Sequence, residues 1–313
     1  MSGVTAASGT TLVAIQLAID ESVLASGASY RAAIEAAATA ALAGARPGPR
    51  LVVFPEVAGH LALYALAPPG ARKGKTLASA LASAAIRRPL DVLRGAVSAR
   101  VFDPRHAVVA GLAPDAERYW RALFGHLART HGAYVVAGSH LRIAASGALT
   151  NASHLFGPDG GVLATTDKVN LIVGVEDSSP GGLGLTRGDP TKLPIVETPF
   201  GRLVTLIGYD AFSSPRTAAE RFSGVGEQIS VRGGCALVAN PAGNHAVHAA
   251  GWPSALAGVP AARHGVTAHL VGHLLDLHYA GASEIVEREA DGALRILARA
   301  ETDDRGCHVI AVV

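Results

Sequence analysis

The chain has few cysteines and little net charge. Only two of its 313 residues are cysteine, Cys235 and Cys307, and two thiols do not make a disulfide framework. The formal net charge is +2 at pH 7, which gives no reason to expect a nucleic acid or an anionic membrane as a partner. These absences exclude a small domain held together by disulfides and a polybasic binding protein.

Long apolar stretches are also absent. The apolar run from Thr11 to Ile19 is too short to cross a bilayer, and no later stretch reaches about 18 uninterrupted apolar residues. The N-terminus lacks the positively charged segment of a signal peptide. We therefore expect a cytoplasmic protein that does not bind membranes.

Several cofactor and metal motifs fail on inspection. Gly182-Leu183-Gly184 is not a dinucleotide fingerprint, because Arg187 takes the place of the third glycine and no helical pattern follows. His269 and His273, with His278 nearby, are four residues apart in a segment that reads as a strand. That separation is about 13 Å at roughly 3.3 Å per residue, too far for one ion to bridge. We expect no metal and no cofactor.

What the sequence does contain is ample material for a core, since 49% of the residues are apolar and 17% are charged. No linker divides the chain, so we expect a single domain over residues 1–313 with an N-terminal tail of about residues 1–10. Apolar strand-like runs alternate with helical stretches. The expected strands are 11–18, 51–54, 133–137, 235–239 and 266–272, and the expected helices are 32–45, 117–129 and a stretch near 217–229.

Three hairpins are predicted among these elements. Pro158-Asp159-Gly160-Gly161 and Ala290-Asp291-Gly292 are Asp-Gly turns between apolar runs, and Pro199-Phe200-Gly201 joins a third pair of strands. Strand-helix-strand units mixed with hairpins indicate an α/β protein with a mixed sheet. The stretch 67–114, rich in Pro, Ala and Gly, is expected to be a loose surface excursion.

A set of short motifs follows in a fixed order along nearly the whole chain. The segments that carry it are Phe54-Pro55-Glu56, Asp167-Lys168-Val169-Asn170-Leu171 with Glu176 eight residues after the lysine, Pro199-Phe200-Gly201-Arg202, Ile207-Gly208-Tyr209-Asp210, Ala239-Asn240-Pro241-Ala242 and Gly281-Ala282-Ser283. Their order and spacing from about Thr11 to Ala298 resemble the nitrilase (carbon–nitrogen hydrolase) superfamily. The resemblance implies a four-layer α-β-β-α sandwich and at least a homodimer.

The catalytic residues of the family are a glutamate, a lysine, a second glutamate and a cysteine. By resemblance, Glu56 is the base, Lys168 stabilises the oxyanion and Glu176 orients the lysine. The nucleophile segment of the family reads Cys-Tyr-Asp, and this chain has Gly208 at the position of the cysteine. Tyr209, Asp210 and Asn240 are expected to help bind the ligand.

The missing sulfur leaves the reaction open. Residues after Asp210 also depart from the family pattern, which favours natural divergence over a single engineered change. Cys235 is expected to be a buried small hydrophobic residue, and Glu56 could act on water instead of a thiol. We therefore expect a protein that acts on a small amide, nitrile or carboxylate ligand without thioester chemistry. The alternative is a pseudoenzyme that binds a ligand or a protein partner.

Overall fold

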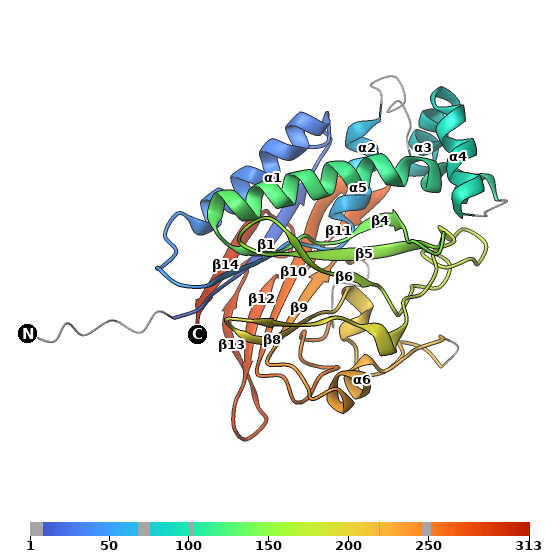
Figure 1. The fold of residues 1–313 in the computed structure, drawn as a ribbon. Coiled ribbons are helices and arrows are strands. Elements are labelled where there is room, and N and C mark those ends of the chain that lie inside the picture. The colour runs from blue at the N-terminus through green and yellow to red at the C-terminus, as the bar shows by residue number, and fades with distance from the viewer. Residues whose placement is uncertain (1–8, 68–75, 100–102, 219, 246–251) are drawn as a thin grey trace, which may run out of the picture.

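Strands and helices pack in four layers in the computed structural model, which describes residues 9–67, 76–99, 103–218, 220–245 and 252–313 (Figure 1). The helices are α1 (Gly27–Leu42), α2 (Ala58–Leu66), α3 (Leu77–Arg87), α4 (Pro89–Ala99), α5 (Pro104–His131) and α6 (Val225–Val231). Short 3₁₀ turns, η2 (Pro190–Lys192) and η3 (Gly208–Ala211), precede and follow the β7–β8 hairpin.

The strands join in one continuous, curled sheet whose central order is β4-β5-β3-β2-β1-β10-β9-β8-β7. Their bounds are β1 (Thr11–Ile19), β2 (Arg50–Val53), β3 (Tyr134–Val136), β4 (His140–Ile143), β5 (Leu149–Phe156), β6 (Val162–Asp167), β7 (Ile195–Thr198), β8 (Gly201–Thr205), β9 (Leu237–Ala242), β10 (His264–Leu274), β11 (Leu277–Tyr279), β12 (Glu284–Arg288), β13 (Leu294–Arg299) and β14 (Cys307–Val312). The run β3-β2-β1-β10-β9-β8 is parallel throughout.

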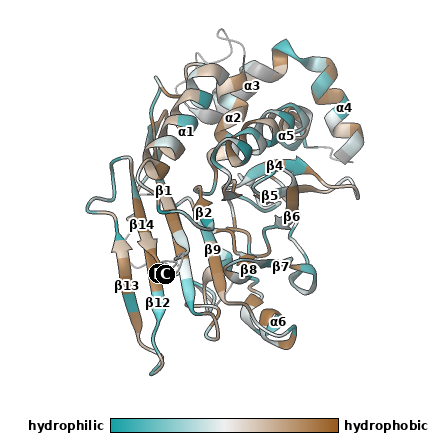
Figure 2. Cartoon of the chain, turned by 60° about the vertical axis from the view of Figure 1, so that its left-hand side comes forward, coloured by the Kyte–Doolittle hydropathy of each residue, from teal (hydrophilic) through white to brown (hydrophobic). Residues whose placement is uncertain are grey.

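Three apolar clusters separate the four layers. One lies between the first half of the sheet and the helices α1 and α5, and it includes Trp120 and Phe124. A second, with Leu51 and Leu237, joins the inner faces of the two halves. The third packs α6 against β8 and β9 through Ile229. The chain is therefore an α-β-β-α sandwich, as the sequence predicted, and β9 in its interior is largely apolar (Figure 2).

Most predicted strands and hairpins are present with boundaries shifted by a few residues. The turn glycines Gly160 and Gly292 have positive φ angles of 80° and 87°, which explains why glycine is needed there. Strands β4, β11 and β14 were not predicted. The predicted tail falls mostly on residues 1–8, outside the described residues.

Two predictions about where helices lie were wrong. Much of the supposed loose excursion at 67–114 forms α3, α4 and the start of α5. Pro89 and Pro104 are the first residues of α4 and α5. The backbone N–H of a first helical residue has no partner within the helix, so proline loses no hydrogen bond there, and its fixed φ suits the helix. The expected helix near 217–229 is only the short α6.

None of the described helices is long and apolar enough to span a membrane.

The parallel strands bring the motif residues to one edge. Glu56 follows β2 and Gly208 follows β8, and parallel strands place their carboxyl ends on the same side of a sheet. Lys168 comes directly after β6. The fold thus gathers residues that lie up to about 150 positions apart in the sequence.

Candidate active site

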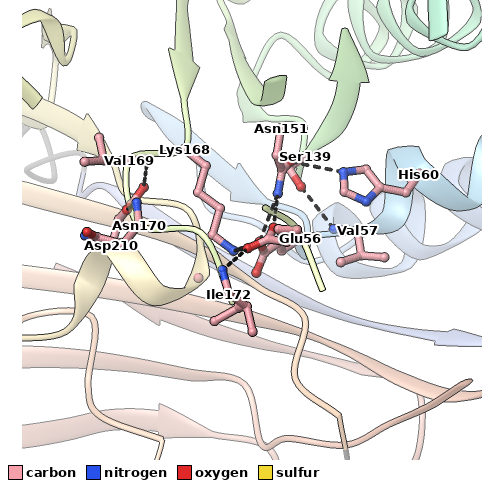
Figure 3. A network of polar contacts seen from close by, with 12 residues as sticks. Glu56, Val57, His60, Ser139, Asn151, Lys168, Val169, Asn170, Ile172 and Asp210 are labelled. Carbon is pink, nitrogen blue, oxygen red and sulfur yellow. Dashed lines mark hydrogen bonds and ion pairs between the residues drawn. The ribbon is translucent and has the colours of Figure 1, made fainter. Parts of the chain in front are cut away.

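Lys168 lies between the two glutamates. Its ammonium donates to Glu56 Oε1 (Figure 3) and to Glu176 Oε2, each at 2.7 Å. All three side chains are almost fully buried. Two carboxylates around one ammonium leave a net negative charge in a site of low dielectric, so the three groups are strongly coupled. Lys168 has a third N–H, which neither of these bonds uses.

Asn151 connects the two carboxylates. Its amide nitrogen donates to Glu56 Oε1 and Glu176 Oε1, both at 3.1 Å. Its amide oxygen is 3.1 Å from Nε2 of His60. Because the oxygen can only accept, the His60 ring is the donor. Burial lowers the pKa of His60 to about 4, so the ring is neutral near pH 7.

The loop that carries Lys168 is held by backbone contacts. Asp210 accepts hydrogen bonds from the amides of Val169 and Asn170, at 3.1 and 2.6 Å. Further along this loop, the amide of Ile172 donates to Glu176 Oε2 at 2.8 Å. These bonds connect the strand-end turn after β8 to the loop after β6. The lysine is therefore positioned by the same segment that contains Gly208.

The carboxylate of Glu56 occupies the space that a side chain on Gly208 would need. A Cβ placed on Gly208 would lie 2.1 Å from Glu56 Oε2, far inside van der Waals contact. The φ of Gly208 is +51°, a conformation that side-chain-bearing residues adopt at a cost. Within the described residues, no hydrogen-bond donor contacts Oε2 of Glu56, while Oε1 accepts from both Lys168 and Asn151.

The pKa values follow from burial and charge. Burial raises the pKa of Glu56 to about 7, and Glu176 adds to this, although Lys168 opposes it. Burial alone would lower the pKa of Lys168, but the two carboxylates outweigh it and the net shift is upward. The lysine is therefore charged near pH 7, whereas Glu56 exchanges its proton close to that pH. This is the range in which a carboxyl group works best as an acid or a base.

These groups open into a cavity of about 590 Å³. Glu56, Lys168 and Glu176 line one part of it. Most of the remaining wall is apolar or aromatic, from residues that include Leu61, Leu63, Val109, Leu141, Leu183, Trp252 and Tyr279. The volume is within the ordinary range for small-molecule sites.

The three residues expected to bind the ligand are placed differently from one another. Tyr209 lines the cavity, but its hydroxyl donates to Glu220 and accepts from the amide of Arg216. Asp210 bonds to the lysine loop, as described above. Asn240 donates to the carbonyl oxygens of Leu206 and Gly208 at 2.6 and 3.2 Å. Direct ligand contact by these three stays a prediction, and the described bonds of Asp210 and Asn240 hold the backbone around Gly208.

Neither cysteine is among the cavity-lining residues. Cys235 is buried beneath α6, and burial raises the pKa of its thiol to about 11, so it is a poor thiolate source. Cys307 is exposed on β14. Among the described residues, His269, His273 and His278 do not converge on a common point, because His269 and His273 both lie on β10.

Two residues of the site were missed by sequence reasoning. Neither Asn151 nor His60 was predicted to belong to the site. His60 lies on α2, which begins two residues after Glu56, and Asn151 lies on the fully buried β5. Four of the eight residues of β5 are polar, so the sequence of that strand alone does not single out Asn151.

No protein-family model matches this sequence, and a comparison with curated proteins finds no match. Solved structures do match. A mutant of the Nesterenkonia AN1 amidase, from the nitrilase superfamily, is 17% identical with a TM-score of 0.60, covering 98% of this chain and 92% of that one. The amidase from Nesterenkonia sp. itself is 18% identical with a TM-score of 0.61, covering 100% and 94%.

Two further structures of that amidase contain a small amide. A double mutant in complex with acrylamide is 17% identical with a TM-score of 0.61, and the match covers 100% of this chain and 93% of that one. A single mutant shows Michael addition of acrylamide at its active site cysteine, with 17% identity, a TM-score of 0.59, and coverage of 97% and 93%. At this level of identity the likeness shows a shared fold.

Proposed function

We propose that this chain is a divergent nitrilase-superfamily hydrolase that cleaves a neutral amide with water as the nucleophile. In this proposal Glu56 and Lys168 are the catalytic residues, and no thiol takes part because position 208 is glycine. The observation that carries the proposal is the placement of Glu56. Its oxygen Oε2 lies 2.1 Å from where a Cβ on Gly208 would be, and Glu56 is one of the residues that line the cavity.

The chemistry assigns one role to each charged group. Glu56 Oε2 takes a proton from water, and the resulting hydroxide oxygen bonds to the carbonyl carbon of the amide. The third N–H of Lys168 donates to the carbonyl oxygen as negative charge develops on it. The protonated Glu56 then gives its proton to the leaving nitrogen as the carbon–nitrogen bond breaks. The products are a carboxylic acid and ammonia or an amine, so all atoms are accounted for.

Electrostatics favours a neutral head group over a carboxylate. The two glutamates outnumber the single ammonium, and Asp210 is buried close to them. An anionic ligand would therefore meet net negative charge in a site of low dielectric. An amide or a nitrile brings no charge and can accept a hydrogen bond from Lys168. The apolar wall fits a substrate whose head carries an apolar body larger than a methyl or vinyl group.

The test is hydrolysis of a matched set of amides, nitriles and carboxylic acids with short and long apolar bodies. Ammonia release and calorimetric binding are measured on the same samples. The variant Glu56→Gln keeps the shape of the side chain and removes the base, so turnover should fall by about 10²–10⁴-fold while binding changes by less than roughly tenfold. Glu227→Gln, an exposed change on α6, is the matched control and should turn over like the wild type.

Each result bears on the proposal. Turnover that survives Glu56→Gln would contradict the assignment of the base. Turnover lost on thiol blocking would contradict water attack and favour a cysteine. Binding of amides without any turnover by the wild type would replace the proposal with the pseudoenzyme alternative.

A further inference from the structure

A second group of ionisable side chains lies behind the cavity, between α5 and the sheet. Glu117 comes from α5, His140 is the first residue of β4, and His154 is on β5. Figure 1 shows α5 running along the face of β4 and β5. One ligand atom from each of the three side chains lies within 4.8 Å of the other two. None of them is among the cavity-lining residues, so the group is separate from the candidate active site.

The two histidine rings are buried with unused nitrogens. His140 is 0% exposed, and among the described residues neither of its ring nitrogens has a hydrogen-bond partner. Nε2 of His154, which is 1% exposed, is unpartnered in the same sense. Nearly all buried polar atoms in folded proteins have a partner, so three such nitrogens at one place need an explanation. The ring centroids are 4.5 Å apart, and one nitrogen of each ring lies within 4.8 Å of the other and of a Glu117 carboxylate oxygen.

The surroundings orient these atoms toward one point. Nδ1 of His154 is 2.9 Å from the hydroxyl of Thr165, which leaves Nε2 facing Glu117. The distance from that Nε2 to Glu117 Oε1 is 3.7 Å, too long for a hydrogen bond. It is close to the separation of about 3.4 Å between two ligands of a tetrahedral ion with bonds of about 2.1 Å. A metal-ligating histidine usually donates its other ring N–H to an acceptor, and the hydroxyl oxygen of Thr165 can accept from Nδ1 of His154.

We propose that Glu117, His140 and His154 bind one divalent transition-metal ion, with Zn²⁺ the best match to two imidazoles and one carboxylate. Such a ligand set is typical of zinc, and it leaves a fourth position for water or another ligand. The three ligand atoms lie within 4.8 Å of one another, so the side chains must close in by at most about 1.4 Å to reach that tetrahedral separation.

Two nearby arginines bear on the affinity. Arg121 is 3.9 Å from Glu117 Oε1 and is about half exposed, so it can turn into solvent when an ion binds. Arg142 pairs with Asp167, which offsets its charge. Positive charge close to the site lowers its affinity for a cation. We therefore expect a weaker site than one surrounded by acidic residues alone.

The ion would tie the helix layer to the turn that carries Glu56. The carbonyl oxygen of Ser139, next to His140, accepts from the amide of Gly59 at 2.8 Å. The hydroxyl of Ser139 accepts from the amide of Val57 at 3.1 Å (Figure 3). A metal at His140 therefore stiffens the start of α2 and the wall of the cavity. The role of the ion is therefore structural, and it does not contact the reacting groups.

The experiment uses the full-length chain stripped with a chelator and titrated with Zn²⁺ alone. Calorimetry should give one ion per chain, and the midpoint of thermal unfolding should rise with the Zn²⁺ concentration, because the ion binds only the folded state. The variants Glu117→Gln and His154→Gln should each weaken binding by roughly 100-fold or more, since even supporting residues of metal sites cost 10- to 100-fold. Circular dichroism establishes that the variants are folded.

Two matched controls locate the ion. His126→Gln removes an exposed histidine from the same helix, α5, and should leave binding unchanged. His278→Gln breaks the stacked pair of His273 and His278, whose ring centroids are 3.7 Å apart and which could attract zinc by itself. Binding that is lost in His278→Gln and kept in Glu117→Gln would overturn the proposal. So would the absence of any one-to-one binding to the wild-type chain, whatever the variants do.

Discussion

Gly208 is constrained by its backbone and by its neighbour at the same time. Its φ is positive, and a Cβ there would overlap a carboxylate that Lys168 and Asn151 hold in place. We predict that Gly208→Cys does not restore amidase activity. A side chain at this φ costs about 1–3 kcal/mol, and displacing Glu56 from its bonds costs more. The free energy of unfolding in urea and ammonia release from simple amides are the measurements.

Two alanine variants separate the causes. Gly208→Ala adds the Cβ without the thiol, and Gly292→Ala adds one at another positive φ, +87°, where no atom lies within 4 Å. The first should lose more stability than the second by the cost of moving Glu56. High turnover of simple amides by Gly208→Cys would contradict the prediction and indicate that Glu56 moves aside easily.

Glu56 sets the expected pH dependence. Burial raises its pKa to about 7 from an ordinary value of 4.5, and the base must be deprotonated to accept a proton from water. We predict that kcat/KM rises about tenfold per pH unit below pH 7 and levels off above it. A profile that is flat between pH 5 and 8, or falls as pH rises there, would contradict this role.

The same shift has a consequence for stability. Because the folded-state pKa lies above the unfolded one, the folded chain binds more protons between about pH 4.5 and 7. The contribution of Glu56 to stability is therefore present below that range and is lost as pH rises through it. We therefore predict that the free energy of unfolding of the wild type, measured relative to that of Glu56→Gln, falls as the pH rises from about 4.5 to 7. Urea unfolding of both proteins across this range measures it.

At the scale of elements, Asp210 joins the turn η3 to the loop that carries Lys168. Replacing it by asparagine exchanges one accepting oxygen for an NH₂ group that faces a backbone N–H. We predict that Asp210→Asn lowers the free energy of unfolding by about 3 kcal/mol, the scale of one or two hydrogen bonds to a charged group. Turnover should fall as well, because Lys168 loses its position.

A control variant and a measurement of ligand binding test whether Asp210 acts by positioning Lys168. Glu227→Gln changes an exposed carboxylate and should leave both quantities unchanged. If Asp210→Asn keeps wild-type stability but loses ligand binding, then Asp210 contacts the ligand directly, as the sequence suggested, and the positioning role is wrong.

The elements themselves were partly readable from the sequence. Buried parallel strands such as β1 and β2 are continuous apolar runs, and the Asp-Gly turns at Gly160 and Gly292 mark hairpins, so both kinds were predicted. The region of α3 and α4 was misjudged because proline was taken as a helix breaker. At the first position of a helix it is a start signal instead, as Pro89 and Pro104 demonstrate.

At the scale of the whole molecule, the sequence predicted the charged residues of the candidate site, which the fold brings together, but not the residues that contact them. Glu56, Lys168 and Glu176 stand in recognisable order, whereas Asn151 and His60 belong to the site only because β5 and α2 fold against the same edge. The cluster of Glu117, His140 and His154 is likewise assembled from three elements without sequence spacing. Contacts of this kind are fixed by tertiary packing, which a single sequence does not display.

The described surface includes a set of exposed apolar side chains on α3 and α4. Their exposed fractions are 80% for Ile86, 66% for Leu90, 61% for Leu93 and 71% for Val97. The last three are spaced by three and four residues, so they share one face of α4. Exposed apolar patches on folded proteins commonly mark interaction surfaces. The expectation of a homodimer, drawn from the family resemblance, stays a prediction, and this face is a suitable place for the contact.

We therefore predict that the wild-type chain sediments as a dimer or larger homo-oligomer, and that Leu93→Glu shifts it toward monomer. A charge on that face must be desolvated for the contact to form, which opposes association. Arg94→Glu is the matched control, because Arg94 lies beside Leu93 on α4 with a side chain that is 79% exposed. Sedimentation velocity over a range of concentrations measures the equilibrium. A wild-type monomer at all concentrations would contradict the oligomer, and an oligomer equally disturbed by Arg94→Glu would contradict the apolar nature of the contact.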